Sequence, residues 1–279
     1  MKYAICNETF QGWDWAETCA AVAENGYEGI EIAPFTFAED VGALSSHARK
    51  AFSDTAKRSG LKIVGLHWLL VSPKGMSLTT LDESVRTQTS EYLAALVDFC
   101  ADLGGEILVL GSPGQRRIPT GDSIQNVESR FLKALIPAIK RAEFHKITLC
   151  LEPLPAPEAD FILTLDQART LITRVDNPYV KTIFDVKSAS SEGASLQSLI
   201  NQFAQMIAHV HANDANRHGP GFGKTDFVPI ISALKNIDYK GYVSVEVFDY
   251  TPDPVTIARD SLAYLKRCEE GDANYESSS

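Results

Sequence analysis

Four residues of types that bind metal ions and transfer protons recur in the second half of the chain. Each stands at the end of a short apolar run; they are Glu152, Asp185, His211 and Glu246. Three carboxylates brought together in a partly dry cavity repel one another, and a divalent cation offsets that repulsion. Any one of these residues could instead cap a helix or pair with an arginine. The recurrence of the set favours a metal site, and its oxygen-rich composition suits Mn²⁺, Mg²⁺ or Co²⁺ better than thiolate-type zinc.

Other polar and aromatic residues stand near these runs. His67 ends the run KIVGL and is predicted either to contact substrate or to make a helix or loop contact. Trp13, Trp68 and Phe248 are expected to form an apolar wall on which a sugar ring can stack. His209 lies two residues before His211, so on a strand both rings face the same way and one can be a core histidine.

Alternating strand and helix patterns provide the elements that position these residues. Short apolar, β-branched runs predict eight strands, at 2–6, 29–33, 62–66, 106–110, 147–152, 180–185, 206–211 and 242–247. Helical patterns lie between and after them, at 13–25, 39–59, 83–103, 121–143, 164–175, 195–205, 226–237 and 254–268.

This alternation predicts an α/β fold of the (β/α)₈ TIM-barrel type, with one domain over residues 1–268 and a polar tail over 269–279. The competing doubly wound sheet usually carries a glycine-rich turn after its first strand, where this chain has Asn7-Glu8-Thr9-Phe10. In a TIM barrel the active site lies at the carboxyl ends of the strands. Glu152, Asp185, His211 and Glu246 are therefore predicted to converge at that end of the barrel.

Composition narrows the class of protein. Of the 279 residues, 44% are hydrophobic and 22% charged, as in soluble globular proteins, and we find no apolar run long enough for a membrane span and no signal peptide. The formal charge of −10 disfavours a nucleic-acid partner. Five dispersed cysteines without a C-x-x-C pair predict reduced thiols in a cytoplasmic protein.

The motifs GYEGIEI, LEP, FD, HVHANDANR, GFGKTDF and SVE carry a family resemblance that covers nearly the whole chain. The chain resembles the xylose isomerase-like TIM-barrel superfamily, and within it the sugar isomerase and epimerase group that includes D-tagatose and D-psicose 3-epimerases. The resemblance implies one divalent ion, with Mn²⁺ expected and Mg²⁺, Co²⁺ or Zn²⁺ as alternatives, held by Glu152, Asp185, His211 and Glu246. It also implies that the two glutamates form the acid/base pair.

The same resemblance implies substrate contacts at Glu158 and Arg217, a sugar substrate, and a homodimer or homotetramer. One departure concerns Ser188, which stands where the 3-epimerases carry a substrate-binding histidine. Gly111 and Ser188 also replace histidines that the trinuclear-zinc endonucleases of the superfamily need.

The expected reaction is proton transfer next to the carbonyl of a ketose or related sugar, through a metal-bound enediolate. The alternative is a metal-dependent dehydratase or lyase acting on a keto-sugar, keto-inositol or 3-keto-glycoside with the same site. A non-catalytic sugar- or metal-binding barrel is the third possibility. The sequence leaves open which sugar is used and whether it is phosphorylated, because Arg116 and Arg117 fit either a phosphate contact or a solvated loop.

The segment HGPGFGKT, residues 218–225, differs by one residue from a phosphate-binding P-loop, because His218 replaces the first glycine. It follows the predicted strand 206–211, and Asp226 is the expected cap of the next helix. We therefore interpret it as a wall of a small-ligand site, with Arg217 reaching inward, and not as a nucleotide-binding loop.

Overall fold

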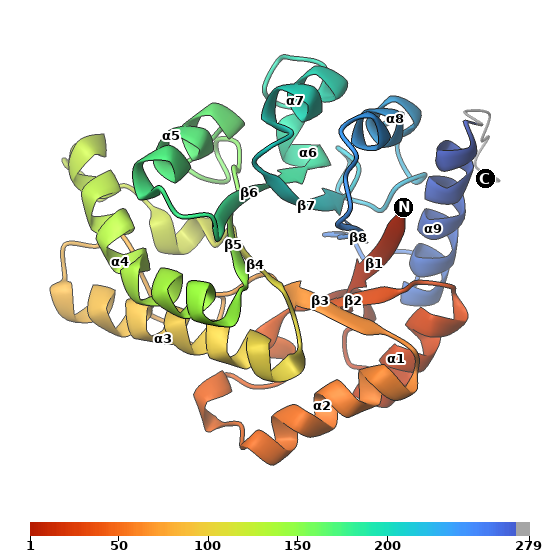
Figure 1. The fold of residues 1–279 in the computed structure, drawn as a ribbon, viewed down its shortest axis with the longest axis horizontal. Coiled ribbons are helices and arrows are strands. Elements are labelled where there is room, and N and C mark those ends of the chain that lie inside the picture. The colour runs from red at the N-terminus through yellow and green to blue at the C-terminus, as the bar shows by residue number, and fades with distance from the viewer. Residues whose placement is uncertain (272–279) are drawn as a thin grey trace. The chain divides into compact units, whose positions relative to one another are not determined.

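The computed structural model describes residues 1–271 and confirms the predicted barrel. Eight parallel strands form a closed barrel in chain order, β1 to β8 (Figure 1). The strands are β1 (Lys2–Cys6), β2 (Gly29–Ile32), β3 (Lys62–Leu66), β4 (Ile107–Leu110), β5 (Thr148–Leu151), β6 (Val180–Asp185), β7 (Ile207–Ala212) and β8 (Tyr242–Val245). All eight predicted strands are present, with ends that differ by at most two residues from the prediction. No helix in this part of the chain is long and apolar enough to cross a membrane.

The helices are α1 (Trp15–Glu24), α2 (Ser46–Arg58), α3 (Glu83–Leu103), α4 (Ile124–His145), α5 (Leu165–Val175), α6 (Val186–Ala189), α7 (Leu196–Phe203), α8 (Val228–Asn236) and α9 (Pro254–Glu270). Short 3₁₀ turns follow the strand ends or precede helices: η1 (Asn7–Phe10), η2 (Pro34–Thr36), η3 (Val41–Ala43) and η4 (Pro113–Arg116). The predicted helix at 39–59 begins only at Ser46. The predicted tail 269–279 overlaps the last turn of α9, and its residues 272–279 lie outside the described part of the chain.

Local sequence signals set several helix ends. Ser123 caps α4 by accepting a hydrogen bond from the Asn126 amide, and Gly104 ends α3 in the left-handed conformation. Asp226 was predicted to cap the helix that corresponds to α8, and this prediction is wrong by one residue, because Phe227 occupies the cap position. The Asp226 carboxylate still accepts a hydrogen bond from the Val228 amide at 2.9 Å.

Residue contacts group the chain into two compact units, and the boundaries between them fall inside β2, α2, β3 and β6. The first unit comprises residues 1–31 and 54–64 and the chain from Phe184 onward. In it, β1 pairs with β2 and β8, and β7 pairs with β8. The second unit comprises residues 32–53 and 65–183, in which β3, β4, β5 and β6 pair in order and α3 lies beside α4 (Figure 1).

The strands are almost wholly buried, which explains why they read as apolar runs and not as alternating patterns. The register between β5 and β6 matters for the site. Leu151 pairs with Thr182, so that Glu152 directly follows β5 beside the strand that ends at Asp185. His211 pairs with Ser244, so that Glu246 lies two residues past the partner of His211. The strand register thus brings the predicted residues to the carboxyl ends of their strands.

Candidate metal and proton-transfer site

The centre of the site in the first unit is formed by Asp185, His211 and Glu246. Asp185 ends β6, His211 lies near the end of β7, and Glu246 directly follows β8. All three side chains are buried, and each offers one ligand atom within 4.8 Å of the others. The Nδ1 atom of His211 lies 3.2 Å from Oε2 of Glu246. Two oxygen donors and one nitrogen donor therefore face a common point.

Asn213 holds the two carboxylates of this group, a role that the sequence analysis missed. Its side-chain Nδ2 donates hydrogen bonds to Oδ2 of Asp185 at 2.6 Å and to Oε2 of Glu246 at 3.3 Å. Its Oδ1 accepts from the backbone amide of Lys187 at 2.9 Å, which fixes the orientation of the amide. The signal was available, because Asn213 lies two residues after His211 in a strand-like segment and so points to the same face.

The electrostatics of the group fit a cation. Burial and the nearby charge of Glu246 raise the pKa of Asp185 above its ordinary value, against the opposing effects of Lys187, His211 and Asn213. The Ser188 amide donates to Oδ1 of Asp185 at 2.6 Å, because Asp185 also caps the short helix α6. Two buried carboxylates that repel each other, beside an imidazole, form a donor set that a divalent cation stabilises.

Glu152, the fourth predicted ligand, directly follows β5 and belongs to the second unit. Its side chain is 8% exposed and packs in the second unit against Gly111, which directly follows β4. A Cβ atom at Gly111 would lie 2.0 Å from Oε2 of Glu152, closer than any real contact. Glycine is therefore required at position 111 for the Glu152 side chain to occupy its observed place.

Arg116, left open by the sequence as a possible solvated loop residue, is fully buried, whereas Arg117 is exposed. Burial lowers the pKa of Arg116 to about 10, and Glu152, Asp160 and Glu158 oppose that effect. None of its three guanidinium nitrogens has a hydrogen-bond partner among residues 1–271. A buried cation thus lies close enough to Glu152 to interact with its charge. From the sequence alone, the pair Arg116-Arg117 could not be distinguished from two surface arginines.

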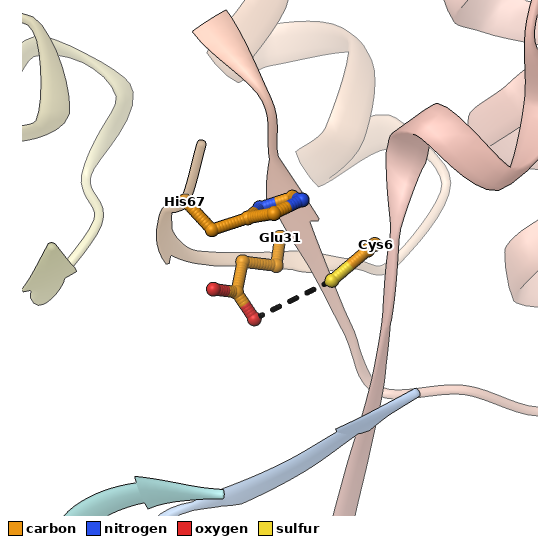
Figure 2. A group of neighbouring side chains, drawn as sticks. All are labelled: Cys6, Glu31 and His67. Atoms are coloured by element: carbon orange, nitrogen blue, oxygen red, sulfur yellow. Dashed lines mark hydrogen bonds between the residues drawn. The ribbon is translucent and has the colours of Figure 1, made fainter. Parts of the chain in front are cut away.

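Glu31, in β2, lies beside His211 and was also missed. Its Oε2 contacts Nε2 of His209 at 2.8 Å, and its Oε1 contacts Nε2 of His211 at 3.2 Å. The thiol of Cys6 donates to Oε2 of Glu31 at 3.8 Å (Figure 2). Burial raises the pKa of Glu31, but its interactions with the two histidines outweigh burial and hold the pKa well below the ordinary value. Glu31 is therefore an ionised hydrogen-bond acceptor.

The predicted substrate residues differ in where they lie. His67 directly follows β3 and is fully buried, and its backbone amide donates to the carbonyl of Ile32 at 3.0 Å. Trp68, half-buried with φ of 52°, places its ring 5.9 Å from that of Phe35. Trp13 is 42% exposed and packs edge-on against Phe10.

Three further predicted contacts, Arg217, Phe248 and Glu158, lie on loops; Lys187, for which no role was predicted, lies in α6 beside Phe248. The guanidinium of Arg217, an exposed residue with φ of 75°, lies 5.4 Å from the ring centre of Phe248. The ammonium of Lys187 lies 4.9 Å from the same ring. Glu158 is half-buried, and its carbonyl accepts a hydrogen bond from Arg117 at 2.6 Å. The roles of the three predicted contacts toward a substrate stay predictions.

The glycine-rich segment 218–225 closes around the chain's own side chains. The carboxylate of Asp214 accepts a hydrogen bond from the Thr225 amide at 2.9 Å, and a Cβ atom at Gly223 would lie 2.2 Å from that carboxylate. A Cβ at Gly219 would meet Ser261 at 2.3 Å. Asp214 and Ser261 thus fill the space beside Gly223 and Gly219, and α8 begins three residues after Thr225 and not within the motif.

A closed parallel barrel with carboxylates and an imidazole at successive strand ends defines the class of (β/α)₈-barrel proteins with a candidate metal site. The family model described as xylose isomerase-like TIM barrel matches residues 19–268, and the chain belongs to that family.

Curated relatives and solved structures agree with this assignment. The 3-dehydro-D-guloside 4-epimerase of Escherichia coli (strain K12) is 35% identical over 118 residues, which cover 42% of this chain and 45% of that protein. A probable ketose 3-epimerase of Synechocystis sp. is 25% identical over 261 residues, or 87% of this chain and 86% of that protein. The crystal structure of 3-keto-D-glucoside 4-epimerase from E. coli, apo form, matches 96% of this chain and all of that chain with a TM-score of 0.83 at 24% identity, which shows a shared fold.

The alignment with the first relative spans less than half of that protein, whereas the alignment with the second spans most of it. The relatives are sugar epimerases by name. The family resemblance drawn from the sequence motifs is thereby confirmed.

Proposed function

We propose that the chain is a divalent-metal-dependent epimerase that acts on a ketose or a related keto-sugar. The observation that carries the proposal is the group Asp185, His211 and Glu246, whose ligand atoms cluster within 4.8 Å. Sugar epimerases with different substrates are among the chain's relatives, which supports the reaction class more strongly than any one sugar.

The four predicted ligands, Glu152, Asp185, His211 and Glu246, would hold the cation, with Mn²⁺ the expected ion. When bound, a divalent cation supplies a Lewis acid that polarises a substrate carbonyl. The work of the protein itself is proton transfer. One of Glu152 and Glu246 removes the proton from the carbon next to the carbonyl, and the other returns a proton to the opposite face. Asn213 holds Glu246 in place during this exchange through its hydrogen bond to Oε2.

The surroundings of the two glutamates differ, which fits unequal roles in the proton exchange. Glu152 lies near the buried cation Arg116, whereas Glu246 lies among Asp185, His211 and Asn213. A nearby positive charge favours the ionised form of a carboxyl, and a nearby negative charge disfavours it.

Incubation in D₂O tests the proposal with a panel of ketohexoses and 3-keto-glucosides. Mass spectrometry and ¹H NMR are expected to show a new stereoisomer that has gained one deuterium on carbon. Loss of water or of the aglycone would assign the dehydratase or lyase reaction instead. Thermal stabilisation by a sugar without any deuterium uptake would assign a binding protein.

Matched variants tie the reaction to the site. Glu152→Gln and Glu246→Gln are each expected to lower kcat by at least about a thousandfold, since each removes one of the two proton-transfer groups. Asp166→Asn, an exposed carboxylate on α5, is the control and should retain normal turnover. Turnover near the normal rate in Glu246→Gln would contradict the proposed acid/base pair.

A further inference from the structure

Two histidine rings converge on a single buried carboxylate behind the candidate metal group. Glu31, His209 and His211 are each fully buried. The carboxylate uses a different oxygen for each ring: Oε2 for Nε2 of His209 at 2.8 Å and Oε1 for Nε2 of His211 at 3.2 Å. Both separations are hydrogen-bond lengths. Glu31 comes from β2 and both histidines from β7, so the barrel itself joins the three side chains.

The chemistry of these contacts fixes the tautomer of each ring. Each oxygen of the Glu31 carboxylate lies at hydrogen-bond length from one Nε2 atom, and a carboxylate oxygen accepts a hydrogen bond, so each of these Nε2 atoms carries a proton. In a neutral imidazole the other nitrogen, Nδ1, then carries a lone pair. In His211 that nitrogen faces the metal group, 3.2 Å from Oε2 of Glu246. The carboxylate thus lies on one side of the ring and the candidate ligand atoms on the other.

We propose that Glu31 is a positioning residue that holds His211 as the Nε2–H tautomer and so presents Nδ1 to a divalent cation. This inference rests on the proposed metal site. His209 has a separate part: by binding Oε2 it keeps the Glu31 carboxylate from turning, so that Oε1 stays aimed at His211. Metal-ligating histidines commonly donate their second nitrogen to a carboxylate, and loss of such a partner weakens metal binding about 10- to 100-fold.

Histidine tautomers can be measured directly in the metal-free protein. Long-range ¹H–¹⁵N NMR of protein labelled in histidine is expected to show a proton on Nε2 of both His209 and His211. Single His209→Gln and His211→Gln variants assign the two signals. A wild-type His211 without a proton on Nε2 would overturn the inference without any need for a variant of Glu31.

Glu31→Gln provides the second test, because a primary amide offers one acceptor and one donor in nearly the same volume. At least one of the two rings must then accept a hydrogen bond at Nε2 and move its proton to Nδ1. The dissociation constant for Mn²⁺, measured by calorimetry, is expected to rise about 10- to 100-fold. At saturating Mn²⁺ the kcat should stay within about threefold, unlike in Glu246→Gln. An unchanged Mn²⁺ affinity would overturn the inference.

Cys6→Ser is the matched control. Cys6 contacts the same carboxylate at 3.8 Å (Figure 2), and no hydrogen bond between it and either histidine is among the contacts described. Its Mn²⁺ affinity is expected to equal that of the wild type, whereas an equal loss in Cys6→Ser would point to general disturbance of the core and overturn the specific role.

The number of bound ions separates two further outcomes. Glu31, His209 and His211 could themselves ligate a cation, so two Mn²⁺ ions per chain would replace the positioning role with a second metal site. If the wild type binds no divalent ion, the metal dependence proposed above fails, and the presentation of Nδ1 to a cation fails with it. If the wild type binds one ion and Glu31→Gln binds it equally well, only the inference about Glu31 fails.

Discussion

At the scale of single residues, the site is a set of buried charges that depend on one another. The side-chain amide of Asn213 donates a hydrogen bond to the carboxylate of Asp185 and another to that of Glu246. Among the described residues, Asn213 alone forms hydrogen bonds with both carboxylates. Arg116 lies near Glu152 as a cation without a hydrogen-bond partner among the described residues. Groups arranged in this way cost stability by themselves, and proteins keep them where function uses them.

Asn213→Ala tests the shared donor. Loss of both hydrogen bonds leaves two buried carboxylates facing each other, so the free energy of unfolding of the metal-free protein should fall by about 2–4 kcal/mol. Urea denaturation with and without Mn²⁺ measures the effect. Saturating Mn²⁺ should restore part of the loss, because the cation replaces the donor. Equal destabilisation with and without Mn²⁺ would indicate a purely structural role for Asn213.

Arg116→Met tests whether the buried cation serves activity at a cost in stability. A buried charge without a partner is unfavourable, so the variant should unfold with a free energy equal to or about 1 kcal/mol above that of the wild type. Turnover should nevertheless fall about tenfold, because Glu152 loses a stabilising positive charge. Urea denaturation and kcat, measured on the same preparation, show whether stability and activity change in opposite directions. Arg117→Met, at an exposed residue, is the control. A large loss of stability would mean that Arg116 holds the loop together.

At the scale of elements, the ends of neighbouring strands limit one another. The carboxyl end of β4 carries Gly111 because the side chain of Glu152, from the next strand, fills the space that a Cβ would need. Glycine is needed at position 111 because it lacks a side chain, and not because its backbone is flexible. This requirement arises only when β4 and β5 pair and bring Glu152 beside Gly111.

Gly111→Ala is therefore expected to displace Glu152 and weaken the metal site. The new Cβ would lie 2.0 Å from Oε2 of Glu152, so the carboxylate must leave its present position. Mn²⁺ affinity should fall at least tenfold, which calorimetry can measure, while circular dichroism stays that of the wild type. Gly114→Ala is the matched control, because no atom lies within 4 Å of a Cβ there. Equal affinities in the two variants would contradict this account.

At the scale of the whole molecule, the last helix and the first strand are joined by a charged contact. Glu269, in the last turn of α9, accepts from the amino group of Met1 at 2.6 Å and from the hydroxyl of Tyr3, in β1, at 2.9 Å. Burial alone would raise the pKa of Glu269, but these two hydrogen bonds outweigh burial and lower it. The contact ties two segments that are 268 residues apart in the chain.

The lowered pKa of Glu269 gives stability a defined pH dependence. A carboxyl whose pKa is lower in the folded state stabilises the fold above its unfolded pKa of about 4.3, and the stabilisation disappears as pH falls through the folded value. Glu269→Gln should therefore unfold at pH 7 with a free energy about 1 kcal/mol below that of the wild type. The difference should shrink as pH is lowered below about 4.3. Urea denaturation from pH 7 down to about pH 2.5 measures it, and a difference that stays constant over this range would exclude the linkage.

The sequence by itself determined the barrel and the residue types at its strand ends. Parallel strands buried on both faces must be apolar along their length, so eight such runs with helices between them were readable without coordinates, and the polar residue at the end of each run stood out. Glu152, Asp185, His211 and Glu246 were all predicted in this way.

Only the tertiary structure decided which side chains surround that group. Glu31 and Arg116 carry no local signal that separates them from a buried ion pair or a surface cation, because the residues near them in space lie elsewhere in the chain. The spacing from His211 could place Asn213 on the same face, but its bonds to Asp185 and Glu246 exist only in the folded chain. The glycine-rich segment 218–225 shows the reverse case, since its motif resembled a ligand loop and the space beside two of its glycines is filled by Asp214 and Ser261. Strand order and register create these contacts, and a sequence specifies them only through the folded chain.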